Sequence, residues 1–163
     1  MLPVNARHRS GPWLIAVLAL AAAVPAAAQG RYSVSADGNE VTDNTTHLAW
    51  RRCAEGLKWN GRTCDGKLMK FFYHEAKTRA SASGGWRLPT REELESIVVK
   101  GKKKPMIDTA AFPNTPSQQF WAVREDADHT DNLNAWLVNF ANGRVYGNVG
   151  QKRFPLRLVR DGH

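Results

Sequence analysis

Two cysteines, Cys53 and Cys64, are the residues of this chain best suited to covalent chemistry. The segment between them, AEGLKWNGRT, contains an Asn60-Gly61 pair, which favours a turn that brings the two thiols together. An even number of cysteines in an oxidising compartment indicates a disulfide. The alternatives are a metal site or a redox pair, but no histidine lies beside either cysteine and the spacing is not CxxC. We therefore predict a structural Cys53–Cys64 disulfide.

A polar segment from residue 124 to residue 134 holds most of the other groups that could bind a ligand or an ion. Its candidate binding residues are Arg124, Asp126, Asp128 and Asp131. Carboxylate oxygens at this density can bind calcium, which makes the three aspartates calcium candidates. The alternative is a solvated loop without a bound ion, and nothing else in the sequence indicates a cofactor.

A lysine run and one tryptophan are the remaining candidates for ligand binding. Lys102, Lys103 and Lys104 follow a predicted helix and are either its solvated end or a basic patch for an acidic polymer. Trp59, inside the cysteine loop, is the tryptophan that we expect to be exposed and able to stack on a ligand. Trp136 is expected in the core, because it alternates with other apolar residues of a predicted strand.

No familiar catalytic pattern is present in the sequence. The histidines beyond residue 28 do not form a pair with metal-ligand spacing, and neither a GxSxG nor a P-loop motif occurs. These observations favour a non-enzymatic recognition module that binds a glycan, an anionic polymer or a protein. An exported hydrolase or modifying enzyme with an unrecognised active site is the alternative.

The N-terminal residues 1–28 have the pattern of a secretory signal peptide. Arg7 and Arg9 precede an apolar run, and the small residues Ala26-Ala27-Ala28 form a cleavage site before Gln29. No later stretch is apolar enough to span a bilayer. We therefore expect a periplasmic or secreted protein with a polar, flexible segment at 29–36 and one domain at 37–163. The full chain has a formal net charge of +8, and removal of Arg7 and Arg9 with residues 1–28 leaves about +6. This charge favours anionic partners, among which we do not expect nucleic acid.

One stretch, GGWRLPTREELESIV, defines the local structure on which the rest of the chain depends. Leu88 precedes a proline, so the WRLP segment should be extended. Thr90 and Glu93 have the spacing of a capping box, which predicts that a helix begins here and runs into the lysines after residue 99. A first helix is predicted at 70–82, where Gly84-Gly85 ends it.

The second half of the chain is dominated by strand patterns. We expect strands at 47–51, 120–123, 135–141, 144–149 and 154–160, with a long irregular loop at 105–118. Asn142-Gly143 predicts a two-residue turn that pairs Phe140 with Val145. Helices in the first half and most strands in the second predict an α+β fold with an antiparallel sheet.

The segments LAWRRC, NGRTC, GGWRLPTREEL, FWAV, AWLVNFANGRV and LRLVR, in this order, resemble the Lcl C-terminal domain family. The resemblance covers roughly residues 37–160 and implies a C-type lectin-like fold. Such a fold has a twisted antiparallel sheet, two helices, long loops that bind the ligand, and strands that bring the two ends of the domain together. It therefore implies that strands 47–51 and 156–160 are neighbours.

The same resemblance implies a bacterial protein at the cell surface or outside the cell. The founding member is implied to be an adhesin that recognises sulfated polysaccharide, which makes adhesion and carbohydrate binding the expected activities. The EPN and WND motifs of calcium-dependent lectins do not occur in this chain. We expect the loops around 100–118 and 124–134 to form the recognition surface.

Overall fold

The computed structural model describes residues 30–123, 135–148 and 151–162. The predicted signal peptide and the acidic segment 124–134 lie outside the described residues. The fold is α+β, with two helices and mostly antiparallel strands, as predicted. Its elements are β1 (Tyr32–Val34), β2 (Glu40–Asp43), β3 (Leu48–Arg51), β4 (Leu57–Trp59), β5 (Cys64–Gly66), α1 (Tyr73–Ser81), α2 (Arg91–Ser96), β6 (Gln119–Ala122), β7 (Ala135–Asn139), β8 (Val145–Asn148) and β9 (Val159–Asp161).

A four-stranded sheet, in the order β1-β2-β3-β9, joins the two ends of the described chain. Trp50 of β3 pairs with Val159 of β9, and the Arg51 N–H donates to the Leu158 carbonyl at 2.9 Å. The predicted proximity of these two strands is therefore confirmed. Strand β1 pairs with β2, so the prediction that the whole of 29–36 is a loose segment is wrong for residues 32–34.

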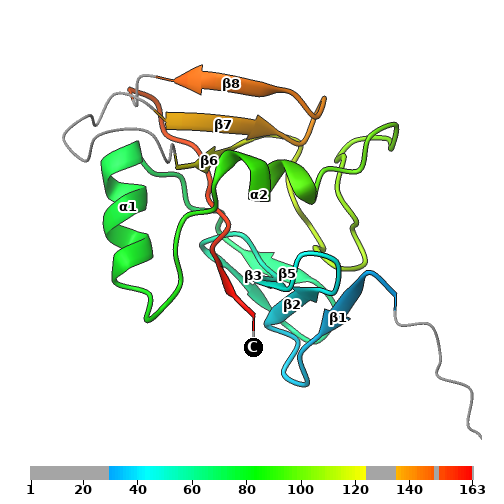
Figure 1. The fold of residues 1–163 in the computed structure, drawn as a ribbon. Coiled ribbons are helices and arrows are strands. Elements are labelled where there is room, and N and C mark those ends of the chain that lie inside the picture. The colour runs from blue at the N-terminus through cyan, green and yellow to red at the C-terminus, as the bar shows by residue number, and fades with distance from the viewer. Residues whose placement is uncertain (1–29, 124–134, 149–150, 163) are drawn as a thin grey trace, which may run out of the picture.

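A three-stranded sheet, in the order β6-β7-β8, forms the other end of the molecule (Figure 1). The predicted hairpin exists, but its register differs by two residues, because Val138 rather than Phe140 pairs with Val145. Phe140 is fully buried, accepts from the Met106 N–H at 2.7 Å and donates to the Gln118 carbonyl at 3.0 Å. Since these contacts take Phe140 out of the ladder, the turn grows to the four residues 140–143.

Both predicted helices are present, but each is shorter than its sequence pattern. Helix α1 begins at Tyr73 rather than at Lys70, and α2 ends at Ser96 rather than within the lysine run. After α2, Val98 forms a bridge with Ile107, and the Val99 N–H donates to the Met106 carbonyl at 2.9 Å. The chain therefore turns back through the lysines, which form the tip of a loop and not a helix end.

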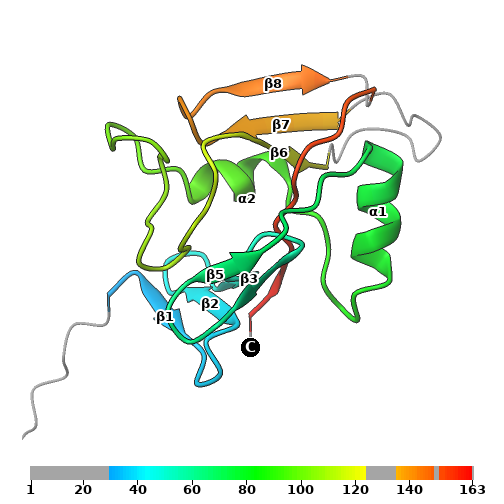
Figure 2. The ribbon, with the colours of Figure 1, turned by 180° about the vertical axis from the view of Figure 1, so that it is seen from behind.

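The core consists of two apolar clusters on either side of the C-terminal segment. One is centred on α2, Trp50 and Phe112, and the other lies between α1 and Trp121. Residues 151–161 run from the β6-β7-β8 sheet to the β1-β2-β3-β9 sheet, as the two opposite views show (Figures 1 and 2). Residues 155–159 are buried without alternation, because both clusters pack against them.

Candidate recognition site

A groove of about 710 Å³ lies between the end of β3, the β4–β5 hairpin and the C-terminal end of α1. We call it the hairpin groove. The side chains that give it its chemical character are Arg51, Glu55, Lys58, Trp59, Met69 and Arg79. Its volume is in the range of ordinary ligand sites. It therefore combines an aromatic ring, a thioether and charged groups in one concave surface.

The predicted disulfide forms one wall of this groove. Cys53 and Cys64 are bonded, and Cys53 lines the groove while Cys64 is fully buried. The Cys64 carbonyl accepts from the Asn114 side-chain amide at 2.8 Å, so the hairpin is also attached to the 105–118 loop. The disulfide and this hydrogen bond fix the hairpin on two sides, which limits how far β4 can move relative to β3.

Trp59, which we expected to be exposed, is instead partly buried, and it lines the hairpin groove. The Arg52 guanidinium lies 3.8 Å from the centre of its ring, a favourable cation–π geometry. Gly38, with φ of 73°, approaches the indole so closely that a Cβ there would collide with Nε1. The ring is therefore held in place before any ligand arrives, and part of its surface is already used within the protein.

A fully buried arginine, Arg157, contacts the main chain beside the groove, and sequence patterns did not single it out. Its guanidinium donates to the carbonyls of Arg51 and Arg52 and, at 2.7 Å, to the Thr115 hydroxyl. Complete burial lowers the pKa of Arg157 to about 9. Because it contacts the main chain of Arg51 and Arg52, this side chain supports the segment that places Arg51 at the groove and Arg52 against Trp59.

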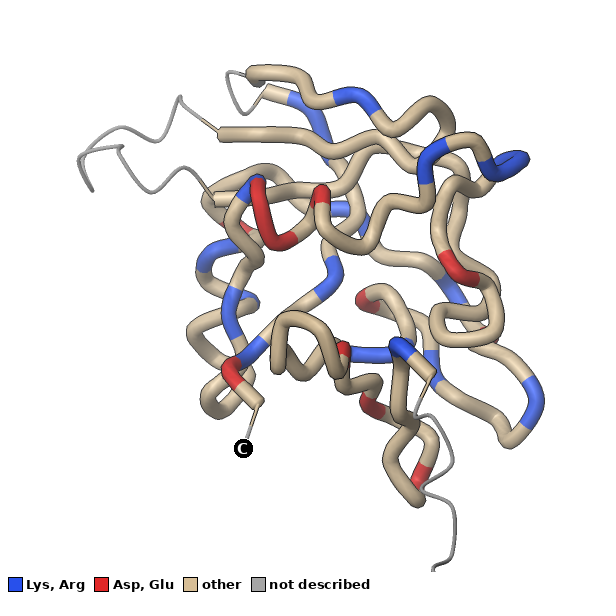
Figure 3. Tube along the Cα trace, turned by 45° about the vertical axis from the view of Figure 1, so that its right-hand side comes forward, with Lys and Arg blue, Asp and Glu red and all other residues tan. Residues whose placement is uncertain are grey.

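The charges that line the groove are mostly positive. Arg79 pairs with Glu55 at 2.7 Å, which leaves Arg51 and Lys58 as the cations without a carboxylate partner among the described groove residues. The Arg51 guanidinium lies 4.3 Å from the centre of the Trp86 ring. Lys58 is exposed. Lys and Arg are distributed over the described trace (Figure 3). Three of them, Arg51, Lys58 and Arg79, line the groove.

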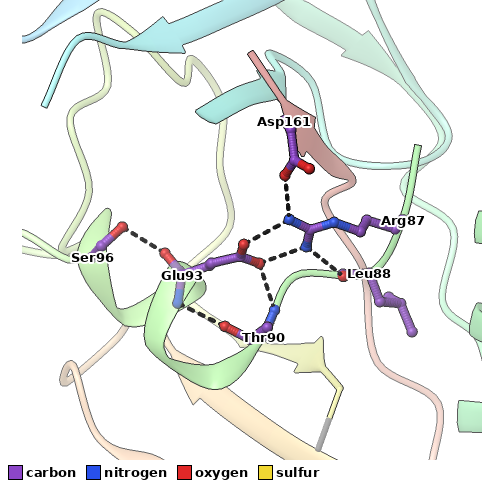
Figure 4. Close-up of polar contacts among 6 residues, drawn as sticks. All are labelled: Arg87, Leu88, Thr90, Glu93, Ser96 and Asp161. Carbon is purple, nitrogen blue, oxygen red and sulfur yellow. Dashed lines mark hydrogen bonds and ion pairs between the residues drawn. The ribbon is translucent and has the colours of Figure 1, made fainter. Parts of the chain in front are cut away.

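The WRLPT stretch forms a polar network that fixes the C-terminal strand (Figure 4). Arg87 donates to both carboxylate oxygens of Glu93 at 2.7 Å and to Asp161 at 2.9 Å. The Thr90–Glu93 capping box is present as predicted, with the Glu93 N–H donating to the Thr90 hydroxyl at 3.1 Å. Arg87 and Val159 also exchange two main-chain hydrogen bonds. This motif therefore positions β9, and through β9 the end of β3, but it does not line the groove.

The lysine run lies in the loop that follows α2 and does not line the hairpin groove. Lys102 donates to the Ile107 carbonyl at 2.6 Å and to the Thr109 hydroxyl at 3.3 Å, so its ammonium group closes the loop. Lys103 and Lys104 are exposed and stay candidates for ligand contact. The other binding and calcium candidates, Arg124, Asp126, Asp128 and Asp131, lie outside the described residues.

Two features are absent from residues 30–123, 135–148 and 151–162. Among those residues, no three His, Cys, Asp or Glu side chains are grouped so that they could hold a metal ion. None of the described helices is both long and apolar enough to cross a membrane.

The sequence model of the Lcl C-terminal domain matches residues 39–160, which is most of the chain. The chain belongs to the Lcl C-terminal domain family. The resemblance drawn from the sequence is thereby confirmed over nearly the same range. No curated protein matches the chain. In this Lcl C-terminal domain, two of the segments that carried the resemblance connect parts of the fold: LAWRRC ends at the disulfide, and WRLPT anchors the C-terminal strand.

Sequence reasoning predicted the disulfide correctly and named Trp59, which lines the groove and whose role in binding stays a prediction, but it did not single out Arg51, Arg79 or Arg157. The first two are separated by more than one element, and only the fold brings them together at the groove. Arg157 stands between Leu156 and Leu158, where a polar residue in an alternating strand is expected to face solvent. No local signal reveals that a second apolar cluster covers that face.

Proposed function

We propose that this Lcl C-terminal domain is the recognition module of an exported or surface protein, and that it binds its partner non-covalently. The observation that supports this proposal most is the hairpin groove, in which Trp59 lies among Arg51, Lys58 and Arg79. An aromatic ring with cations around it suits a partner that has both apolar and anionic groups. The partner class is a glycan, an anionic polymer or a protein at the cell surface.

Several findings agree with an exported protein of this kind. The Cys53–Cys64 disulfide is compatible with the periplasm or the cell exterior. We further infer a C-type lectin-like fold, and the support for it is the β3–β9 closure, the two helices and the long 105–118 loop. In this proposal the loop around Lys103 and Lys104, together with segment 124–134, is a second candidate surface, and the signal peptide is cleaved after Ala28.

The experiment that tests the proposal compares the two surfaces with matched lysine variants. The oxidised protein is applied to an array of sulfated, carboxylated and neutral glycans and of cell-surface proteins, alongside Lys58→Gln and Lys103→Gln. If the groove is the site, Lys58→Gln should weaken binding about two- to fivefold, and Lys103→Gln should leave it unchanged, because an exposed ion pair contributes about 0.2–1 kcal/mol.

Binding should also weaken at high salt, because exposed charges are screened over about 8 Å at physiological ionic strength. The reverse pattern, with loss only in Lys103→Gln, would move the site to the 100–118 loop. If the affinity changes neither with salt nor with Lys58→Gln or Lys103→Gln, neither surface is an electrostatic recognition site.

A further inference from the structure

Strand β4 has an edge that pairs with no other strand in the described structure, and this edge faces the hairpin groove. β4 and β5 form a sheet of their own with two strands. All three residues of β4, Leu57–Trp59, line the groove, whereas no residue of β5 does. The side of β4 opposite to β5 is therefore the side that the groove exposes.

The hydrogen bonds of the hairpin indicate which main-chain groups point into the groove. The Asn60 N–H, just after β4, donates to the Thr63 carbonyl at 3.1 Å, and Lys58, two positions earlier in the chain, is paired with Asp65. Hydrogen-bonded pairs alternate with non-bonded pairs in an antiparallel ladder. Trp59, paired with Cys64, is therefore in a non-bonded position, and its N–H and C=O are directed away from β5. The Leu57 N–H, by contrast, already donates to the Ala54 carbonyl at 3.0 Å.

We propose that an extended, acidic segment of a partner protein binds the hairpin groove by adding as a strand to the free edge of β4. This inference rests on the function proposed above and specifies the partner. An added strand uses its main chain for affinity and its alternate side chains for specificity. The main-chain donor and acceptor of Trp59 provide the first requirement. Trp59 and the half-exposed Met69 provide apolar contacts for the second.

The charge of the groove specifies an acidic segment. Arg51, Lys58 and Arg79 face a single carboxylate, Glu55, among the residues that line it. An acidic side chain on the added strand can pair with Lys58 or Arg51 without displacing the Arg79–Glu55 ion pair. A polysaccharide could use the same cations, but it has no regular main-chain N–H and C=O groups with which to complete a sheet edge. The exposed strand edge therefore favours a protein partner over an anionic glycan.

The test uses blocked peptides that alternate Glu and Val, measured against the oxidised full chain by fluorescence anisotropy and by amide chemical shifts. Two N-methylated versions carry methyl groups on opposite edges of the peptide strand. Only one edge can face β4, so one version should lose about tenfold in affinity, since it loses hydrogen-bond donors and cannot approach the edge. The other version is the matched control and should bind like the parent peptide.

Protein variants complete the test. Lys58→Gln should weaken the parent peptide about two- to fivefold, whereas Lys103→Gln should not change its affinity. The largest amide shift on binding should be that of Trp59, and a Lys-Val peptide should not bind. Equal binding of both methylated peptides, or no binding of the Glu-Val peptide, would overturn strand addition.

Heparin, used as an anionic polysaccharide probe, distinguishes a failure of strand addition from a failure of the proposed function. If the peptides fail but heparin binds in a manner weakened by Lys58→Gln, strand addition is wrong and the groove remains a recognition site. If neither heparin nor peptide binding responds to Lys58→Gln, both the inference and the groove as a recognition site are rejected.

Discussion

Replacing Arg157 by methionine should destabilise the protein by ~2 kcal/mol, less than replacing it by lysine. Two opposing contributions determine this value. The depression of its pKa to about 9 by burial corresponds to ~5 kcal/mol against the buried cation. Against this, hydrogen bonds from a charged donor contribute roughly 1.5–3 kcal/mol each. The guanidinium makes three, to Arg51, Arg52 and Thr115, which together offset the burial and leave a small surplus.

Methionine removes the burial cost of the cation together with its three hydrogen bonds. The ~2 kcal/mol is the small surplus plus the cost of leaving the Arg51 and Arg52 carbonyls without this donor. Lysine keeps the buried charge but cannot reproduce the geometry of the guanidinium, so its cost should be about 4 kcal/mol, as for a buried charge that loses its partners. The assay is urea unfolding followed by tryptophan fluorescence at neutral pH. Arg62→Met, at an exposed arginine, is the control and should change stability by less than about 0.5 kcal/mol. The reasoning is refuted if Arg157→Met proves as destabilising as Arg157→Lys, or more so.

The remaining predictions concern the buried carboxylate of Asp43 and the capping box of α2. Asp43 is fully buried, and although burial alone would raise its pKa, hydrogen bonds from Arg31 and from the N–H groups of Thr45 and Thr46 hold that pKa below its ordinary value. The folded protein therefore binds this proton less readily than the unfolded chain, so stability should be lost as the pH falls below about 4. Asp43→Asn should be less stable at neutral pH and show a flatter stability profile between about pH 5 and pH 2; an unchanged profile in urea titrations at several pH values contradicts this. Thr90→Ala should cost about 1 kcal/mol, because the capping box of α2 is lost, and a change below about 0.3 kcal/mol in thermal unfolding would show that the cap is dispensable.

Structure that depends on neighbouring residues could be predicted from this sequence. Thr90 and Glu93 are three residues apart, and their capping box specifies the start of α2 wherever the helix packs. The disulfide followed from the two cysteines and the turn between them. Trp59 was identified because it is an aromatic residue within that small loop.

Structure that depends on distant contacts could not be predicted. The end of α2 is set by the pairing of Val98 with Ile107, which competes with further helical turns. The register of the β7–β8 hairpin is set by hydrogen bonds between Phe140 and two residues of the 105–118 loop. The Asn142-Gly143 turn motif contains no information about these bonds. The hairpin groove likewise depends on α1 lying beside the β4–β5 hairpin, so the meeting of Arg79 with Glu55 could not be foreseen.

The pairing of β3 with β9 has a consequence for the order in which the molecule is assembled. Residues 48–51 are made early, but their partners at 159–161 are made more than a hundred residues later. Until the later segment emerges, β3 has an open edge and both apolar clusters lack the backbone of residues 155–159 between them. Contacts this distant in sequence slow folding and cannot form progressively from the N-terminus. The chain should therefore remain an open intermediate during synthesis and reach its native state in one late, cooperative step. A ribosome-stalled chain that ends before residue 154 should expose Trp50 to a fluorescence quencher, whereas release of the full chain should protect it.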